Sequence, residues 1–194
     1  MSSRRQLLLL GATALVAGGA GVFLARHQRT QPTDAQGDSG AFPGEAYPLP
    51  DLAGESHVLS EWAGKVLVVN FWATWCPPCL TEIPGFVALQ QALGPQGLQF
   101  IGVALDDVEA VREFAQARQV SYPLLVGEEP VMALMREFGN THGGLPFTVV
   151  LGRNGKVLHL KQGEWDQAAA MTTLLPFLGD FGTAVRPEFA PKKP

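Results

Sequence analysis

The chain has 194 residues, of which 46% are hydrophobic and 16% are charged, and its formal net charge is −4. This length and composition are typical of one globular domain with short appended segments. The mild acidity offers no basic surface to a nucleic-acid backbone, so we exclude a nucleic-acid partner. Both cysteines of the chain stand in the short stretch "WATWCPPCLTEIP".

Residues 1–25 form a distinct N-terminal segment. Arg4 and Arg5 precede an uncharged run over residues 7–25. This run approaches the roughly 20 apolar residues of a transmembrane helix and exceeds the roughly 7–15 residues of a signal-peptide core. We therefore predict a retained membrane anchor, with a signal cleaved after small residues such as Ala20 as the alternative.

The start "SRRQLL" also resembles the twin-arginine export signal, although the two arginines equally suit the positive start of any signal. Each interpretation keeps the arginines inside and exports the rest of the chain. We predict a periplasmic or extracytoplasmic domain, held at the inner membrane by residues 1–25. Residues 26–46 are polar and rich in glycine, proline and glutamine, which indicates a flexible linker.

The remaining chain is expected to form one domain over residues 47–180, followed by a tail over residues 181–194. Short apolar β-branched runs indicate buried strands, and apolar residues at helical spacing indicate the helices between them. Asn154-Gly155 between two such runs predicts a β-hairpin. The expected order is strand 65–73, a helix after the cysteines, strand 98–105, a helix capped by Asp106 or Asp107, strand 122–126, helix 130–138, hairpin strands 146–151 and 156–162, and helix 165–178.

Alternation of strands and helices requires parallel crossovers, and the final hairpin adds antiparallel strands. The sequence therefore predicts an α/β fold of three layers, with a mixed central sheet between helices.

The cysteine pair lies where a strand ends and a helix begins. Cys76 stands at the predicted helix N-terminus, where the helix dipole and free N–H groups favour a thiolate. Cys79 lies one turn further on, within reach of a disulfide. We expect Cys76 to attack as the nucleophile and Cys79 to resolve the mixed disulfide.

Other uses of the cysteines are less favoured. A structural zinc site needs four ligands, and the histidines are scattered without ligand spacing. A structural staple would close a loop of a few residues, which stabilises little. We expect a redox-active Cys76–Cys79 disulfide, with no metal and no further cofactor.

Two longer stretches resemble a known family. "NFWATWCPPCLTEIP", followed by "GLPFTVVLGRNGKVL", closely resembles the TlpA/ResA-like thiol-disulfide oxidoreductases of the thioredoxin superfamily, and the resemblance covers residues 45–180. It implies a thioredoxin fold with a short N-terminal hairpin and a central insertion. It also implies a tethered reductase that takes electrons from a transmembrane thiol reductase and reduces exported proteins, such as apocytochrome c or copper-site cysteines, or that serves general thiol homeostasis.

The resemblance further implies that Pro146 is a cis-proline against the disulfide, although trans is the usual state of such a bond. Leu145 and Pro146 would offer backbone hydrogen bonds to a substrate chain. Pro77 and Pro78 belong to the same substrate-facing region. Phe147 departs from the acidic residue of dedicated cytochrome-maturation members, which weakens that assignment.

Two tryptophans border the cysteines. We expect Trp72 to pack in the core and Trp75 to contact partners at the surface.

Glu82 and Asn70 carry the expected proton chemistry. Ordinary thioredoxins hold an aspartate where this chain has Asn70, which cannot act as a base. Glu82 lies three residues after Cys79 on the same helical face. If it is partly buried, desolvation raises its pKa toward the working range of a general base.

Two other classes of protein share features with the reductase. A copper-binding chaperone would use Cys76, Cys79 and His142, although such proteins usually space their cysteines more widely. The peroxiredoxin pattern requires a threonine three residues before the cysteine, and here Thr74 is two before it, so this class is rejected.

Overall fold

The centre of the fold is a buried β-strand next to the cysteines. The structure is a computed structural model that describes residues 42–179. Every residue of β3 (Val66–Trp72) is buried, and β4 (Leu98–Ala104) runs parallel to it. Continuous burial on both faces explains why β3 reads as an unbroken apolar run in the sequence.

A five-stranded mixed sheet extends from this pair in the order β5-β4-β3-β6-β7. The strands β3, β4 and β5 are parallel, whereas β6 is antiparallel to β3, and β7 to β6. The remaining elements are β1 (Leu49–Pro50), β2 (Ser56–His57), η1 (Leu59–Trp62), α2 (Pro77–Leu93), η2 (Gly94–Gln96), α3 (Val108–Arg118), β5 (Leu124–Val126), α4 (Glu129–Glu137), β6 (Phe147–Leu151), β7 (Val157–Gln162) and α5 (Gln167–Leu178).

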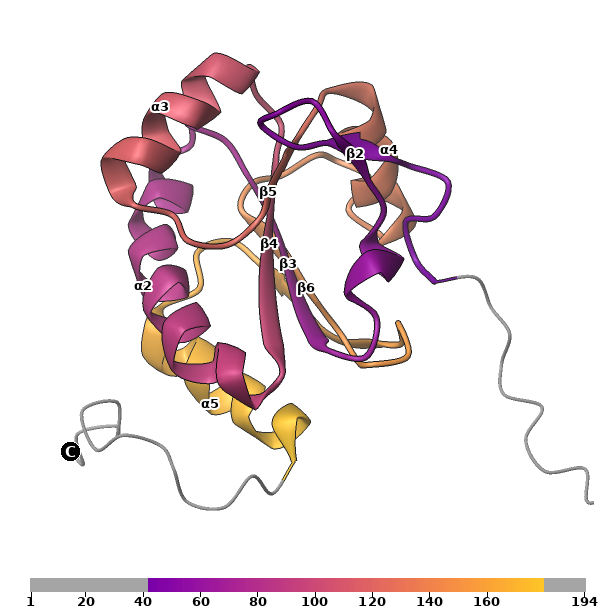
Figure 1. Ribbon diagram of the computed structural model, residues 1–194, viewed down its shortest axis with the longest axis vertical. Coiled ribbons are helices and arrows are strands. Elements are labelled where there is room, and N and C mark those ends of the chain that lie inside the picture. Colours follow the sequence, from indigo (N-terminus) through magenta and orange to yellow (C-terminus); the bar gives the residue numbers. More distant parts are fainter. Residues whose placement is uncertain (1–41, 180–194) are drawn as a thin grey trace, which may run out of the picture. The chain divides into compact units, whose positions relative to one another are not determined.

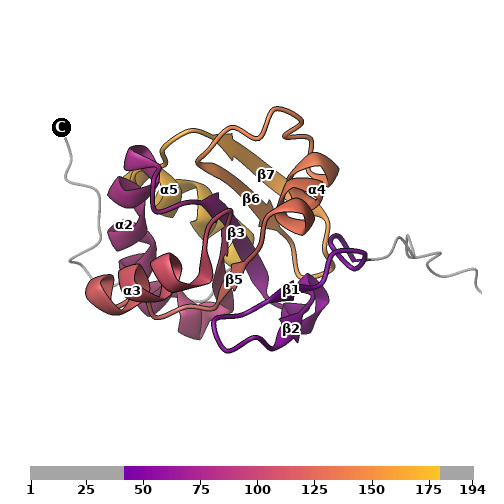
Figure 2. The ribbon, with the colours of Figure 1, turned by 90° about the horizontal axis from the view of Figure 1, so that it is seen from above.

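Helices cover both faces of the sheet, so the predicted three layers are confirmed. Figure 1 shows α2 and α3 on one face and α4 on the other, and Figure 2 shows α5 beside α2. One core cluster packs Val66, Val68 and Trp72 against α2, α3 and α5. The second packs Leu67 and Phe71 against α4 and the N-terminal segment. Alternate residues of β3 therefore serve different cores.

The predicted order of elements is confirmed, with small shifts at the ends. The strand expected over residues 122–126 is shorter, because it begins only after Tyr122 and Pro123. The strands β1 and β2 pair as the implied N-terminal hairpin. The implied central insertion falls in the chain between β4 and β6. This part of the chain includes the edge strand β5.

The packed domain starts earlier than the sequence indicated. The predicted linker ended at residue 46, yet Phe42 packs against the second core cluster, and the Gly44 N–H donates to the Glu137 carboxylate at 3.1 Å. A single aromatic residue in a polar segment gave no periodic signal. The predicted anchor (1–25), the linker before residue 42 and the tail (181–194) lie outside the described residues. Within residues 42–179, no helix has the length and apolar character to cross a membrane.

Candidate active site

Both cysteines lie at the junction of β3 and α2. Cys76 is the N-cap of α2, Cys79 lies in its first turn, and a disulfide joins them with their Cα atoms 5.3 Å apart. The Leu80 N–H donates to the Cys76 carbonyl at 3.2 Å, the first of the helical hydrogen bonds. Cys76 is 5% exposed, whereas Cys79 has no exposed surface. Cys76 is thus the sulfur that a partner reaches first, and the resolving position lies beneath it.

Apolar residues flank Cys76 along the chain. Pro77 and Pro78 are the first two residues of α2, the former exposed and the latter half-buried. Trp75 is 63% exposed, directly before the cysteine. We call Trp75, Pro77 and Pro78 the apolar rim. Proline has no backbone N–H, so this helix N-terminus carries two donors fewer than usual.

The second tryptophan of the motif belongs to the core. Trp72 is 1% exposed, and its ring lies 5.0 Å from the ring of Phe114 in α3. The expected packing role of Trp72 is confirmed, and the exposure of Trp75 agrees with the surface position expected of it.

The loop before β6 lies beside the end of β3, from which the cysteine segment leaves. The Leu145–Pro146 peptide bond is cis, as the resemblance implies. Phe147 pairs with Phe71 near the end of β3, which places Pro146 beside the point where the cysteine segment leaves that strand. The Pro146 carbonyl accepts from the Gly163 N–H at 2.9 Å.

Glu82 lies on the buried side of α2, three positions and about one helical turn after Cys79, with 3% of its surface exposed. Its Oε1 accepts from Asn70 Nδ2 at 2.8 Å, and its Oε2 accepts from the Trp165 N–H at 2.8 Å. The Asn70 amide also donates to Thr148 Oγ1 at 3.0 Å. A carboxylate on the buried face of α2 is therefore held by groups from β3 and from the loop before α5.

Burial and hydrogen bonding oppose one another at this carboxyl group. Desolvation raises the pKa of Glu82 to about 7, and the nearby charge of Glu164 acts in the same direction. The hydrogen bonds from the Trp165 N–H and Asn70, and the charge of Lys161, favour the carboxylate and limit the rise. A carboxyl group with this pKa can exchange a proton near neutral pH.

Asp106 is a site residue that sequence reasoning missed. The sequence indicates Asp106 only as one of two possible caps of α3, and the cap is Asp107. One oxygen of Asp106 instead accepts from both the N–H and the hydroxyl of Thr74, each at 2.7 Å. Thr74 lies 32 positions earlier, two residues before Cys76. No local pattern links the two residues, because the adjacency of β3 and β4 brings them together.

Two histidine-containing groups carry atoms of the kind that bind metals. His142 of the copper alternative is exposed, and its Nδ1 lies 3.2 Å from Thr141 Oγ1.

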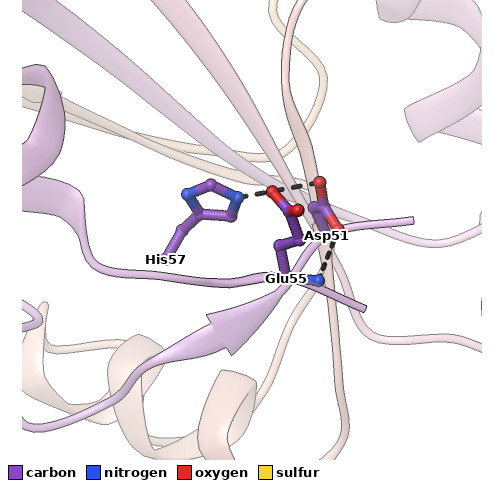
Figure 3. Close-up of side chains that lie close together, drawn as sticks. All are labelled: Asp51, Glu55 and His57. Carbon is purple, nitrogen blue, oxygen red and sulfur yellow. Dashed lines mark hydrogen bonds and ion pairs between the residues drawn. The ribbon is translucent and has the colours of Figure 1, made fainter. Parts of the chain in front are cut away.

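In the β1–β2 hairpin, ligand atoms of Asp51, Glu55 and His57 lie within 4.8 Å of one another (Figure 3). The hydrogen bonds of Asp51 and His57 stabilise the hairpin and its contact with η1. Asp51 accepts from the N–H groups of Ala53 and Glu55 in the hairpin turn. His57 Nδ1 lies 2.7 Å from Glu61 Oε2, and this hydrogen bond raises the pKa of His57.

The mixed sheet, the disulfide at the N-terminus of α2 and the neighbouring cis-proline define a thioredoxin-like domain with a redox-type cysteine pair. The chain belongs to the Redoxin family, whose sequence description matches residues 34–175.

Named relatives agree with this placement. The thiol-disulfide oxidoreductase ResA of Geobacillus thermodenitrificans is 31% identical over 116 residues, which are 59% of this chain and 64% of that protein. The thioredoxin-like protein YneN of Bacillus subtilis is 33% identical over 91 residues, which are 45% of this chain and 53% of that protein. The chain thus spans less than two thirds of the length of these relatives.

Solved structures share the fold. A thiol:disulfide interchange protein of the thioredoxin family from Chlorobium tepidum TLS is 26% identical, with a TM-score of 0.60 over 73% of this chain and all of that one. The dsbF protein of MTB, solved in mixed oxidized and reduced forms, is 26% identical, with a TM-score of 0.59 over 68% of this chain and 94% of that one.

Proposed function

We propose that the chain is an extracytoplasmic thiol-disulfide oxidoreductase that reduces disulfides in exported proteins through Cys76 and Cys79. The observation that carries this proposal is the disulfide at the N-terminus of α2, with Cys76 5% exposed and flanked by the apolar rim, and Cys79 fully buried. A thiol at a helix N-terminus, where the helix dipole favours the thiolate, paired with a buried resolving thiol, suits thiol–disulfide exchange.

The reduced pair would react in two exchanges. The Cys76 thiolate attacks one sulfur of the substrate disulfide, the substrate S–S bond breaks, and one substrate sulfur leaves as a thiolate. The Cys79 thiol then gives its proton to Glu82, and its thiolate attacks the Cys76 sulfur of the mixed disulfide. The second substrate sulfur leaves, both substrate thiolates take up protons, and the two electrons of the dithiol reside on the substrate.

The direction of exchange depends on how well the Cys76 thiolate is stabilised. Because Pro77 and Pro78 donate no N–H, this thiolate has fewer hydrogen bonds than at an ordinary helix N-terminus. A less stabilised thiolate makes the dithiol a better reductant, and about 1.4 kcal/mol corresponds to about 30 mV in this couple. The chain therefore donates electrons rather than accepting them.

Residues 1–25 hold the domain at the outer face of the inner membrane, where a transmembrane thiol reductase resupplies electrons. The substrate class is exported proteins with accessible disulfides, including cytochrome c or oxidase copper-site cysteines. Phe147 is buried and stacks on Phe71, with ring centroids 5.7 Å apart, so it presents no acidic group to a substrate. This supports a general reductase over one dedicated to apocytochrome c.

Trapping of mixed disulfides tests the proposal. The Cys79→Ala variant lacks the resolving thiol, so in cells it should accumulate covalent adducts with exported proteins that dithiothreitol releases. The matched Cys76→Ser variant should form none. Equal adduct formation by both variants, or adducts only with cytoplasmic proteins, would contradict the proposal.

A further inference from the structure

Asn70 makes an asymmetric set of contacts in the core. It lies in the middle of β3 with 1% of its surface exposed, opposite Thr148 in the register with β6. Its amide nitrogen donates to Glu82 Oε1 at 2.8 Å and to Thr148 Oγ1 at 3.0 Å. Its Oδ1 is fully buried and has no hydrogen-bond partner within residues 42–179.

Stability alone does not explain an amide at this position. A buried acceptor without a partner is costly, and an apolar side chain of similar volume would avoid the cost. Neighbouring positions of β3 that face the same core, Val68 and Trp72, are apolar. The reason for an amide at this position is therefore sought in the side chains to which its N–H groups donate, Glu82 and Thr148.

The contacts of Glu82 are those of a carboxylate. Both oxygens face donors, namely the amide of Asn70 and the backbone N–H of Trp165. A protonated carboxyl group would direct its own hydrogen at one of these donors, which would break that hydrogen bond. The hydrogen bonds thus act against the desolvation that favours the protonated form.

We propose that Asn70 is a positioning residue of the redox site, whose amide fixes Glu82 as a carboxylate on the buried face of α2, ready to accept the proton of Cys79. This inference rests on the proposed function, because it assigns a partner to the proton acceptor of that reaction. Thr148 accepts the second N–H of the amide at 3.0 Å and makes no contact with Glu82 in the hydrogen bonds of this group.

The other groups that face Glu82 are unchanged by a substitution at Asn70. Glu164 and Lys161 act on the carboxyl group with opposite sign. The phenol of Tyr122 is buried nearby, and its own pKa is raised by burial and by the Glu82 charge, so it stays neutral. Cys79 is held in the disulfide in the oxidised chain. A change in Glu82 titration therefore reports the loss of the amide donor.

The test is a ¹³C NMR titration of the Glu82 carboxyl group in the purified, oxidised full-length chain. In Asn70→Leu the donor to Oε1 is lost, and the titration midpoint should rise by about one pH unit, a tenfold change in proton affinity. Thr148→Val is the matched control, because it removes the second contact of the amide while leaving the donor to Glu82, and its midpoint should stay within about 0.3 pH units.

Asn70→Ala keeps the test decisive if Asn70→Leu does not fold. It removes the donor to Oε1 without adding bulk or charge, so the midpoint should again rise by about one pH unit. An unchanged midpoint in a folded Asn70 variant would overturn the proposal. Equal shifts in Asn70→Leu and Thr148→Val would also overturn it, because they would indicate a general loss of packing.

A kinetic measurement separates this inference from the proposed function. The pH midpoint of mixed-disulfide resolution should shift with the carboxyl midpoint in Asn70→Leu. If the wild-type chain forms and resolves no mixed disulfide, the proposed function fails, and the NMR midpoints still decide whether Asn70 fixes Glu82. If resolution occurs but its pH midpoint in Asn70→Leu stays at the wild-type value while the NMR midpoint of Glu82 shifts, the positioning role in catalysis is wrong.

Discussion

At the scale of single residues, Glu82 is an ionisable side chain in a buried place, where the loss of solvent disfavours its charged form. It is buried beside Asn70 and Trp165, and its pKa rises to about 7 because desolvation outweighs two hydrogen bonds. In an unfolded chain the same group titrates near 4.5. The difference links proton binding at this one side chain to the stability of the whole domain.

This linkage predicts how stability changes with pH. Between pH 4.5 and pH 7 the folded chain binds more protons at Glu82 than the unfolded chain, so the free energy of unfolding falls as pH rises and levels off above about pH 7. The expected fall is about 3 kcal/mol. Urea unfolding of the oxidised chain across this range measures it. Glu82→Gln should abolish this part of the pH dependence, whereas the exposed control Glu164→Gln should retain it.

Substitution of the two tryptophans of the motif should affect stability and partner binding differently, because Trp75 is exposed and Trp72 is buried. Trp75→Ala removes an exposed ring, so the free energy of unfolding should change by less than about 0.5 kcal/mol. The KM for a folded protein disulfide should rise several-fold, while the rate with oxidised glutathione stays unchanged. Trp72→Ala should instead destabilise the domain by about 3–5 kcal/mol. A loss of the same size with both substrates in Trp75→Ala would refute a docking role.

At the scale of elements, the segment between β3 and α2 is held by the neighbouring strand. Asp106, just beyond the end of β4, accepts two hydrogen bonds from Thr74 and so fixes the backbone that leads to Cys76. The Leu105 N–H also donates to the Trp72 carbonyl at 3.0 Å. The parallel pairing of β3 and β4 thus extends beyond the strands and sets the position of the redox pair.

Hydrogen exchange tests this clamp. A hydrogen bond to a charged acceptor contributes about 1.5–3 kcal/mol, so Asp106→Ala should speed exchange of the Thr74 amide by roughly 10- to 100-fold. Asp107→Ala removes the same charge one residue later and should affect only the first turn of α3, whose Glu109 and Ala110 N–H groups it caps. Unchanged protection of Thr74 in Asp106→Ala would show that the clamp is unimportant.

The elements themselves were predictable where the signal is local. The apolar run of β3, the Asn154-Gly155 turn and the aspartate cap of α3 each lie within a few residues, and the structure has all three. The strands β1 and β2 have two residues each, too few for a periodic pattern, and only the family resemblance indicated them. The contacts of Asn70 with Glu82 and Thr148 span 12 and 78 positions, so no local pattern could reveal them.

At the scale of the whole molecule, the chain enters the domain far from the redox pair. A Cβ atom added to Gly155, in the β6–β7 turn, would lie 2.7 Å from the ring of Phe42, so the first described residues lie beside this turn. Because β6 is antiparallel to β3, the turn is at the opposite end of the sheet from Cys76. The first described residues and the redox pair therefore lie at opposite ends of the central sheet.

The reduction potential of the Cys76–Cys79 pair tests the central claim most directly. It is measured by equilibrating the chain with glutathione or dithiothreitol redox buffers and counting free thiols at each ratio. Because two prolines remove N–H donors from the Cys76 thiolate, the account predicts a potential near roughly −200 mV or lower, on the side of thioredoxin. A potential above roughly −150 mV, toward the strongly oxidising periplasmic enzymes, would mean that the chain oxidises its partners and would contradict a reductase.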